Sequence, residues 1–194
     1  MNTTLEQLDL SKTYTYADYL RWQFEERLEL IKGRIFKMSP APSVRHQHIS
    51  GNIFREISWF LKNYPCRVFS APFDVRLSKK GAKNNQITTV VQPDISVICD
   101  TSKLDDRGCI GAPELVVEIL SPANSTKEMR HKFELYEENG VQEYWVVFIA
   151  EELLQIYRLG ENGKYVADRP YVPGDEVGTP LLPGFKLLVS EIFE

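Results

Sequence analysis

Two acidic residues stand in segments of this chain that are otherwise apolar. Asp94 lies within the strand-like run 88–99, and Glu118 interrupts the β-branched run Leu115–Leu120. A buried carboxylate is costly unless it is paired or binds a metal, and two neighbouring carboxylates favour magnesium. Lys132 lies on a predicted helix downstream, where its ammonium could hold a water or offset negative charge. A metal ion beside these groups could polarise a phosphate and activate water, so the chemistry they indicate is phosphodiester hydrolysis.

The same three residues also allow a purely structural interpretation. Asp94 would cap a bulge in its strand, and Glu118 would be neutralised by Lys132 in a buried ion pair. Buried pairs of this kind also occur without catalysis, so the residue types alone leave the two interpretations equally open.

A strand, a helix and a second strand are predicted to position Glu118 and Lys132. In chain order they are a strand at Leu115–Leu120 closed by Ser121-Pro122, a helix capped by Ser125 or Thr126 that runs to about Asn139 and is stopped by Gly140, and a strand at 144–149. Such units are almost always right-handed parallel crossovers. The helix carries Met129, Phe133 and Tyr136 on one apolar face, and Lys132 borders that face. Glu118 and Lys132 can therefore meet over one strand end.

Glu29 is a further candidate from the N-terminal part of the chain. It lies in the first strand of a predicted hairpin, 27–31 and 34–38, whose tight turn uses Gly33 for a positive φ. Pairing with its own hairpin neighbours is the simpler role for this carboxylate.

His46 is the second additional candidate. It stands at the start of a predicted helix over 45–62 and could hydrogen-bond a backbone group or a phosphate. His46 and His48 lack the third ligand that a zinc site needs, so a zinc centre is not predicted.

The remaining segments complete an α/β domain with a mixed sheet. The run 67–77 is strand-like and is interrupted by Pro72, while Pro93 within 88–99 implies a bulge or an edge position. The Pro- and Gly-rich tail, 165–194, is expected to wrap the core.

Composition predicts one ordinary globular domain, residues 14–194, preceded by an arm, residues 1–13. The 194 residues are 43% hydrophobic and 26% charged, with no apolar run long enough for a membrane and no signal-peptide pattern, so we expect a cytoplasmic protein. Cys66, Cys99 and Cys109 are odd in number and far apart, which favours free thiols. The net charge of -4 and pI near 5.5 argue against a broad basic surface for nucleic acid.

Several motifs stand in a characteristic order along the chain. They are ELIKGRIFKMSP, RHQHISGNIF, PFDVRL, VVQPDISVI, GAPELVVEILSP, the Lys132–Tyr136 pair and GVQEYWVV. Together they resemble the large bacterial Uma-two family of restriction-endonuclease-like proteins, which belongs to the PD-(D/E)XK nuclease superfamily. The resemblance covers about residues 14 to 192.

The resemblance implies an αβββαβ core, with a mixed sheet and an N-terminal β-hairpin extension. It also implies a Mg²⁺-dependent hydrolytic site, with Mn²⁺ as a substitute, DNA as substrate and no organic cofactor. The matching motif positions make Asp94 and Glu118 the metal ligands and catalytic acids. Glu29 and His46 match family positions of auxiliary catalytic groups.

Three positions depart from the family's pattern. The lysine expected two positions after the second acid is Leu120, so its catalytic role would pass to Lys132 on the following helix. Phe148 stands where an aspartate is frequent, and Arg34 replaces a frequent glutamate. The set Asp94, Glu118 and Lys132 remains intact.

Two functions follow from these expectations. The first is a Mg²⁺-dependent endonuclease that hydrolyses DNA phosphodiester bonds, and the alternative is an inactive nuclease-fold protein that serves as a binding or assembly module. One site cuts one strand, so we expect a homodimer in which a partner covers the exposed edges near 27–38. A monomer whose edges are blunted by Lys32, Arg34 and Lys37 is the alternative.

Overall fold

A mixed central sheet organises the part of the chain described by the computed structural model, residues 8–22, 26–38, 42–120 and 126–194. Its six strands run in the order β12-β11-β10-β9-β6-β3. They are β3 (Arg67–Ser70), β6 (Ile95–Ile98), β9 (Leu115–Leu120), β10 (Glu143–Phe148), β11 (Leu153–Leu159) and β12 (Tyr165–Ala167). Within this sheet β9 and β10 are parallel and the other neighbours antiparallel.

The predicted strand–helix–strand unit is confirmed at the heart of this sheet. The first strand has the predicted bounds, and the second begins at Glu143, one residue earlier than expected. Helix α3 (Thr126–Asn139) connects them and ends before Gly140, whose φ of 80° is the left-handed conformation that stops a helix. The predicted turn at Ser121-Pro122 and the cap at Ser125 lie outside the described residues.

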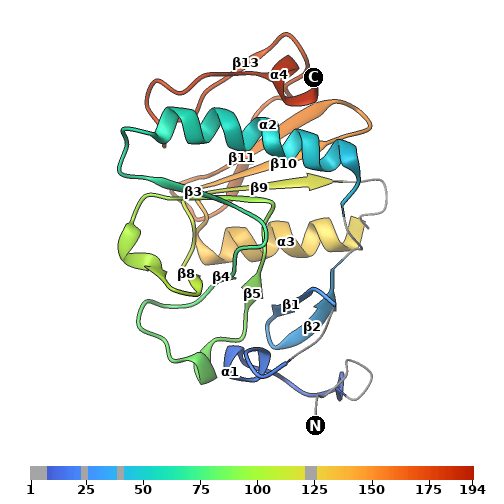
Figure 1. The fold of residues 1–194 in the computed structure, drawn as a ribbon, viewed down its shortest axis with the longest axis vertical. Coiled ribbons are helices and arrows are strands. Elements are labelled where there is room, and N and C mark those ends of the chain that lie inside the picture. Colours follow the sequence, from blue (N-terminus) through green and yellow to red (C-terminus); the bar gives the residue numbers. More distant parts are fainter. Residues whose placement is uncertain (1–7, 23–25, 39–41, 121–125) are drawn as a thin grey trace.

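Two helices cover opposite faces of the central sheet (Figure 1). Helix α2 (Val44–Leu61) buries Ile49, Ile53 and Ile57, which are four residues apart and so lie on one face of the helix. Helix α3 packs on the other face, where Tyr136 is fully buried beside Tyr144 of β10. Alternate residues of β9 therefore face different helices, and Glu118 shares the α3 face with Val116.

The tail packs beside α2 on the same face of the central sheet and so covers part of the core, as expected. It contains the short pair β13 (Glu176–Val177) and β14 (Leu187–Leu188) and ends in helix α4 (Val189–Phe193). Phe185 and Ile192 are buried in the same apolar cluster as the inner face of α2. Figure 1 shows this segment, in orange and red, lying beside α2.

The predicted hairpin is confirmed, with Lys32 (φ 50°) and Gly33 (φ 77°) in its turn. It is one edge of a second six-stranded sheet, here called the hairpin sheet, in the order β2-β1-β5-β4-β8-β7. Its strands are β1 (Leu28–Ile31), β2 (Arg34–Lys37), β4 (Val75–Arg76), β5 (Val90–Val91), β7 (Leu104–Asp105) and β8 (Gly108–Ile110). Short 3₁₀ turns lie at Asn84–Gln86 and Thr101–Lys103.

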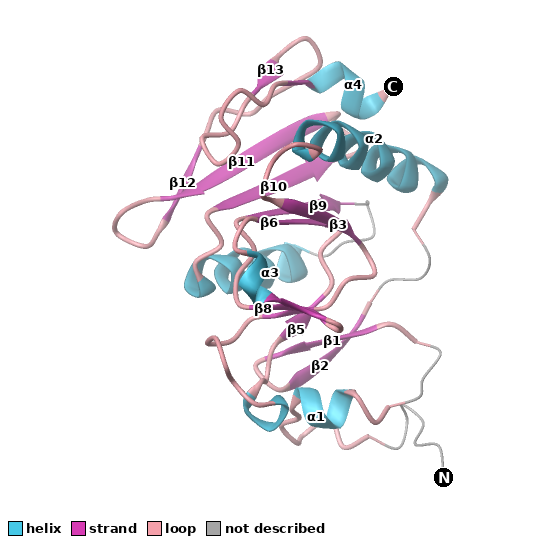
Figure 2. Cartoon of the chain, turned by 60° about the vertical axis from the view of Figure 1, so that its left-hand side comes forward, coloured by secondary structure: helices cyan, strands magenta, loops and turns pink. Residues whose placement is uncertain are grey.

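The hairpin sheet lies below α3, and helix α1 (Tyr16–Tyr19) packs at its far end (Figure 2). Tyr16 is buried there against Leu30 and Val90. From α4 to α1 the molecule is thus a stack in which α3 separates the two sheets (Figures 1 and 2).

Two predicted strands are each divided between the sheets. The run 67–77 contributes β3 to the central sheet and then β4 to the hairpin sheet. The run 88–99 contributes β5 to the hairpin sheet and then β6 to the central sheet. Proline cannot donate to a strand ladder, and the chain leaves one sheet for the other around Pro72 and Pro93. The expectation of a bulge or edge strand at Pro93 is therefore corrected to a crossing between sheets.

The expectation of free thiols is wrong for two of the three cysteines. Cys66 and Cys99 form a disulfide across 33 residues of sequence, and Cys109 is a buried free thiol. The cause is strand pairing, because the register of Arg67 with Ile98 brings the two flanking cysteines opposite each other. Within the described ranges, none of the helices is both long and apolar enough to span a bilayer.

Candidate active site

Asp94 and Glu118 occupy neighbouring positions at one end of the central sheet. Ile95 of β6 pairs with Val117 of β9, so continuing this antiparallel register by one residue sets Asp94 opposite Glu118. The backbone N–H of Ile119 donates to Oδ2 of Asp94 over 2.7 Å, which fixes that carboxylate against β9. The structure therefore brings the two predicted acids to the same place.

Lys132 reaches these acids from α3. Its Nζ lies 2.8 Å from Oε1 of Glu118 and 3.1 Å from Oε1 of Glu29, and all three side chains are buried. The approach of Lys132 to Glu118 follows the expectation from helix geometry.

Glu29 joins the group from the hairpin sheet rather than pairing with its hairpin neighbours. Its Oε1 accepts from the Lys132 ammonium and from the backbone N–H of Gln92, the latter over 3.0 Å. The site is thus assembled from both sheets, with α3 between them.

His46 borders the site from the first turn of α2. Its backbone N–H donates to the Ser43 side chain, which caps the helix, and its Nε2 lies 3.4 Å from Oδ2 of Asp94. Burial alone would lower the pKa of His46, but the hydrogen bond and charge of Asp94 outweigh it and raise that pKa. Nδ1 of His46 is buried without a hydrogen-bond partner among the described residues.

Tyr136 is a member of the site to which the sequence analysis gave no role beyond the apolar face of α3 and a place in a family motif. Its hydroxyl donates to Oε1 of Glu118 over 2.6 Å, one helical turn from Lys132. The available signal was the spacing of four residues between Lys132 and Tyr136, which sets both on one side of the helix.

Burial dominates the electrostatics of this cluster. It raises the pKa of Glu118 to about 7, with Asp94 and Glu29 adding to the rise and Lys132 opposing it. Burial would lower the pKa of Lys132, but the Glu118 and Glu29 carboxylates outweigh it and hold that pKa well above its ordinary value. Lys132 is therefore a cation at neutral pH, suited to donating hydrogen bonds and offsetting negative charge rather than to accepting a proton.

The donor set fits a hard divalent cation that is held only partly by protein. Among the residues with described positions, no three His, Cys, Asp or Glu side chains form a group that could enclose a metal. Hydrogen bonds from the described residues are donated to Oδ2 of Asp94 and to Oε1 of Glu118. The other oxygen of each carboxylate accepts none of these bonds. Magnesium is typically bound by one or two carboxylates together with waters and substrate phosphates, which suits these two residues.

Two departures from the family's sequence pattern lie side by side. Leu120 of β9 pairs with Phe148 of β10, and both pack on the apolar cluster around Tyr136. The two positions where the family has a lysine and an aspartate are therefore apolar here. The positive charge beside Glu118 comes from the ammonium of Lys132 instead. Arg34, the third departure, bonds the backbone carbonyl oxygens of Leu10 and Ser11.

Comparison with solved structures defines the class of fold. A crystal structure described as a putative nuclease belonging to DUF820, from Anabaena variabilis ATCC 29413, superposes with a TM-score of 0.72. The similarity covers 93% of this chain and 97% of that chain at 22% sequence identity, so it establishes a shared nuclease-like fold.

Sequence comparison defines the family. A Synechocystis sp. (strain ATCC 27184 / PCC 6803 / Kazusa) protein named only as uncharacterized is 28% identical over 152 residues, which are 77% of this chain and 76% of the relative. Residues 16–190 match the profile of Uma2, described as "Putative restriction endonuclease". The chain belongs to this family.

Proposed function

We propose that this protein is an endonuclease that hydrolyses DNA phosphodiester bonds with a divalent cation, Mg²⁺ or Mn²⁺, held by Asp94 and Glu118. The observation that carries the proposal is the convergence of two acids and the Lys132 ammonium from three separate elements. Membership of a family described as "Putative restriction endonuclease" supports this reaction class and DNA as the substrate.

The bound cation would polarise the scissile phosphate and favour ionisation of a water, which is the chemistry that metal ions supply in such sites. Lys132 donates hydrogen bonds and offsets the negative charge that accumulates on the phosphate. Glu29 and Tyr136 hold Lys132 and Glu118 in position through their bonds to Nζ and Oε1. His46 orients Asp94 from the opposite side.

The alternative is an inactive nuclease-fold protein that serves as a binding or assembly module. Its supporting observation is that Lys132 is already neutralised by two buried carboxylates, as a structural ion-pair network would be. The net charge of -4 also gives the chain little general attraction for DNA.

Plasmid nicking by the purified chain separates the two functions. With Mg²⁺ or Mn²⁺, the wild type should convert supercoiled DNA to open-circular or linear forms, and a chelator should stop the reaction. Asp94→Asn and Glu118→Gln should each reduce the rate by about a hundredfold or more, because each removes a metal-binding charge.

The matched control is Glu161→Gln, which removes a carboxylate from an exposed turn. It should cut as fast as the wild type. Cleavage that persists at the wild-type rate in Asp94→Asn would remove the proposed site. Complete inactivity of the wild type, together with no uptake of Mn²⁺, would overturn the endonuclease proposal in favour of the alternative.

The proposal includes a homodimer, because two antiparallel DNA strands present two scissile phosphates and each chain offers one candidate site. The exposed edge at β2 and the tail offer surface that a second copy could cover. Light scattering across a dilution series should give twice the 22.4 kDa mass of one chain. A constant mass of one chain would leave single-strand nicking as the expected activity.

A further inference from the structure

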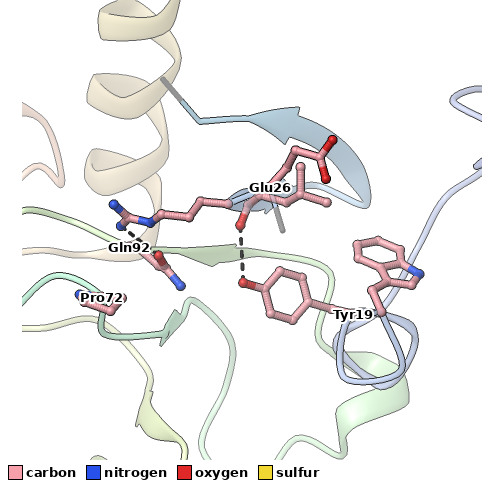
Figure 3. A pocket seen from close by; sticks show the side chains of 7 residues that line it. Tyr19, Glu26, Pro72 and Gln92 are labelled. Carbon is pink, nitrogen blue, oxygen red and sulfur yellow. Dashed lines mark hydrogen bonds between the residues drawn. The ribbon is translucent and has the colours of Figure 1, made fainter. Parts of the chain in front are cut away.

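A pocket of about 290 Å³ opens beside the candidate active site, between α1 and the start of β1 (Figure 3). In Figure 3 Tyr19 stands on one side of it, Pro72 and Gln92 on the other, and Glu26 at the rim. The full lining is Tyr19, Trp22, Glu26, Arg27, Leu28, Pro72 and Gln92.

Residues that line the pocket are linked to the site through the backbone. Leu28 directly precedes Glu29, and Gln92 donates its backbone N–H to that same carboxylate over 3.0 Å. On the opposite wall, Pro72 follows Ala71, whose N–H donates to the Asp94 carbonyl oxygen over 3.0 Å. Some of the residues that would contact a ligand in this pocket are therefore the same as, or next in sequence to, residues that bond Glu29 and Asp94.

The lining combines aromatic walls with a charged rim. Tyr19 and Trp22 lie with ring centroids 5.7 Å apart, and the Tyr19 hydroxyl is anchored on the Leu28 carbonyl oxygen. Arg27 is exposed at the rim and bonds the Gln92 side chain over 2.9 Å, so its guanidinium is held at the pocket mouth. Aromatic rings stack on nucleobases whatever their sequence, and a guanidinium pairs with phosphate.

A nucleobase matches this pocket better than a phosphate or a peptide segment. The volume is close to the lower limit of about 300 Å³ for small-molecule sites, which suits a single flat ring system. Glu26 at the rim would repel a phosphate that entered but can accept hydrogen bonds from the amino groups of a base. Arg27 remains available to the phosphate that stays outside.

We infer that this pocket takes up one unpaired base of the DNA whose backbone enters the Asp94–Glu118–Lys132 site. The inference rests on the proposed function and names its substrate class: DNA with unpaired nucleotides, as in single strands, flaps or mismatches. A base in a duplex must first be unstacked, which costs a few kcal/mol and is least for an already unpaired base. Stacking also supplies affinity that a chain with a net charge of -4 does not obtain from long-range attraction.

Binding measured without cleavage tests this inference. Fluorescence anisotropy in EDTA would compare a labelled single-stranded 12-mer with the same sequence as a duplex. The wild type should bind the single strand at least about tenfold more tightly, and Trp22→Leu and Arg27→Gln should each weaken single-strand binding by about tenfold while leaving the duplex unchanged. Arg55→Gln, an exposed arginine on α2, is the control and should bind as the wild type.

A second readout reports the base itself. A single 2-aminopurine in the 12-mer should change its fluorescence when it stacks in the pocket, and Trp22→Leu should abolish the change. Because Trp22 packs on Tyr14 and Tyr19, the exposed Arg27→Gln keeps the test valid where the tryptophan variant does not fold. Equal affinity for single strand and duplex, or single-strand affinity unchanged in Arg27→Gln, would overturn the inference.

The failure of this inference and of the proposed function are distinguishable. Nicking that depends on Asp94, with no preference for single strands, overturns the pocket and keeps the nuclease. Single-strand binding that depends on Arg27, with no cleavage, keeps the pocket and overturns the nuclease. Absence of DNA binding in every form overturns both.

Discussion

The Tyr136 hydroxyl and the Lys132 ammonium donate to the same oxygen of Glu118, Oε1, over 2.6 and 2.8 Å. Both donors stabilise the ionised carboxylate. Tyr136→Phe should therefore raise the pKa of Glu118 and weaken Mn²⁺ binding at pH near 7 by about threefold to tenfold, the effect of one hydrogen bond. Isothermal titration calorimetry with Mn²⁺ measures this change.

Tyr165→Phe is the matched control for that experiment. It removes a hydroxyl that donates to the Val141 carbonyl oxygen over 2.9 Å, away from the acids. Both tyrosine variants should lose about 1 kcal/mol of unfolding free energy, but only Tyr136→Phe should bind Mn²⁺ more weakly. Equal Mn²⁺ affinity in the two variants would show that Tyr136 has a packing role alone.

Lys132→Met should be strongly destabilising, because it leaves Glu29 and Glu118 buried without their shared cation. Removing one partner of a buried ion pair typically costs about 3–5 kcal/mol. Urea unfolding measures this loss, and Lys164→Met, which breaks a surface pair with Glu137, should have a much smaller effect on stability.

The destabilisation caused by Lys132→Met should depend on pH and become smaller as the pH falls. Burial already raises the pKa of Glu118 to about 7, and loss of the ammonium raises it further. At lower pH the carboxyl takes up a proton and the uncompensated charge disappears. The variant should therefore be less destabilised at about pH 5.5 than at about pH 8.5, and a larger loss at the acidic pH would contradict this account.

Metal affinity should follow the ionisation of Glu118. The carboxylate form would bind the proposed cation, and its fraction rises as pH increases through about 7. Apparent Mn²⁺ affinity should fall by up to about tenfold for each pH unit below that value and level off above it. Titrations over this range test the slope; Glu118→Gln should bind weakly at every pH, and a flat wild-type profile would exclude Glu118 as a ligand.

Thiol counting tests the disulfide. The chain has three cysteines, and Cys66 and Cys99 are bonded, so denatured protein should show one reactive thiol without reductant and three after reduction. In the native state Cys109 should not react, because burial raises the pKa of its thiol to about 12. Three reactive thiols in unreduced protein would indicate that the bond does not form, as expected in a reducing compartment.

The strand–helix–strand unit could be predicted because its signals are local. Glu118 lies within a short apolar run, and Gly140 marks the end of the following helix, so neither needs knowledge of distant residues. The division into two sheets could not be predicted, because Pro72 and Pro93 signal where a ladder stops but not where the chain goes next. The Cys66–Cys99 bond was missed for a related reason, since it depends on how β3 pairs with β6.

The approach of Asp94, Glu118 and Lys132 was anticipated, whereas the contributions of Glu29 and Tyr136 were not resolved. A tyrosine at a helical spacing is most simply a core residue, and nothing in the sequence separates that role from its bond to Glu118. Glu29 has partners in other elements, Gln92 and Lys132, which only the stacking of the two sheets brings to it.

The ion pair between Lys132 and Glu29 spans 103 residues of sequence and joins α3 to the hairpin sheet. Contacts between residues so far apart in sequence form late in folding. The chain must lose the entropy of closing the long intervening loop before such a contact can stabilise it. During synthesis, the hairpin emerges from the ribosome before the helix that carries Lys132 has been made. The complete cluster can arise only after both sheets have docked on α3, so a nascent or misfolded chain would not carry the assembled cluster of Glu29, Glu118 and Lys132.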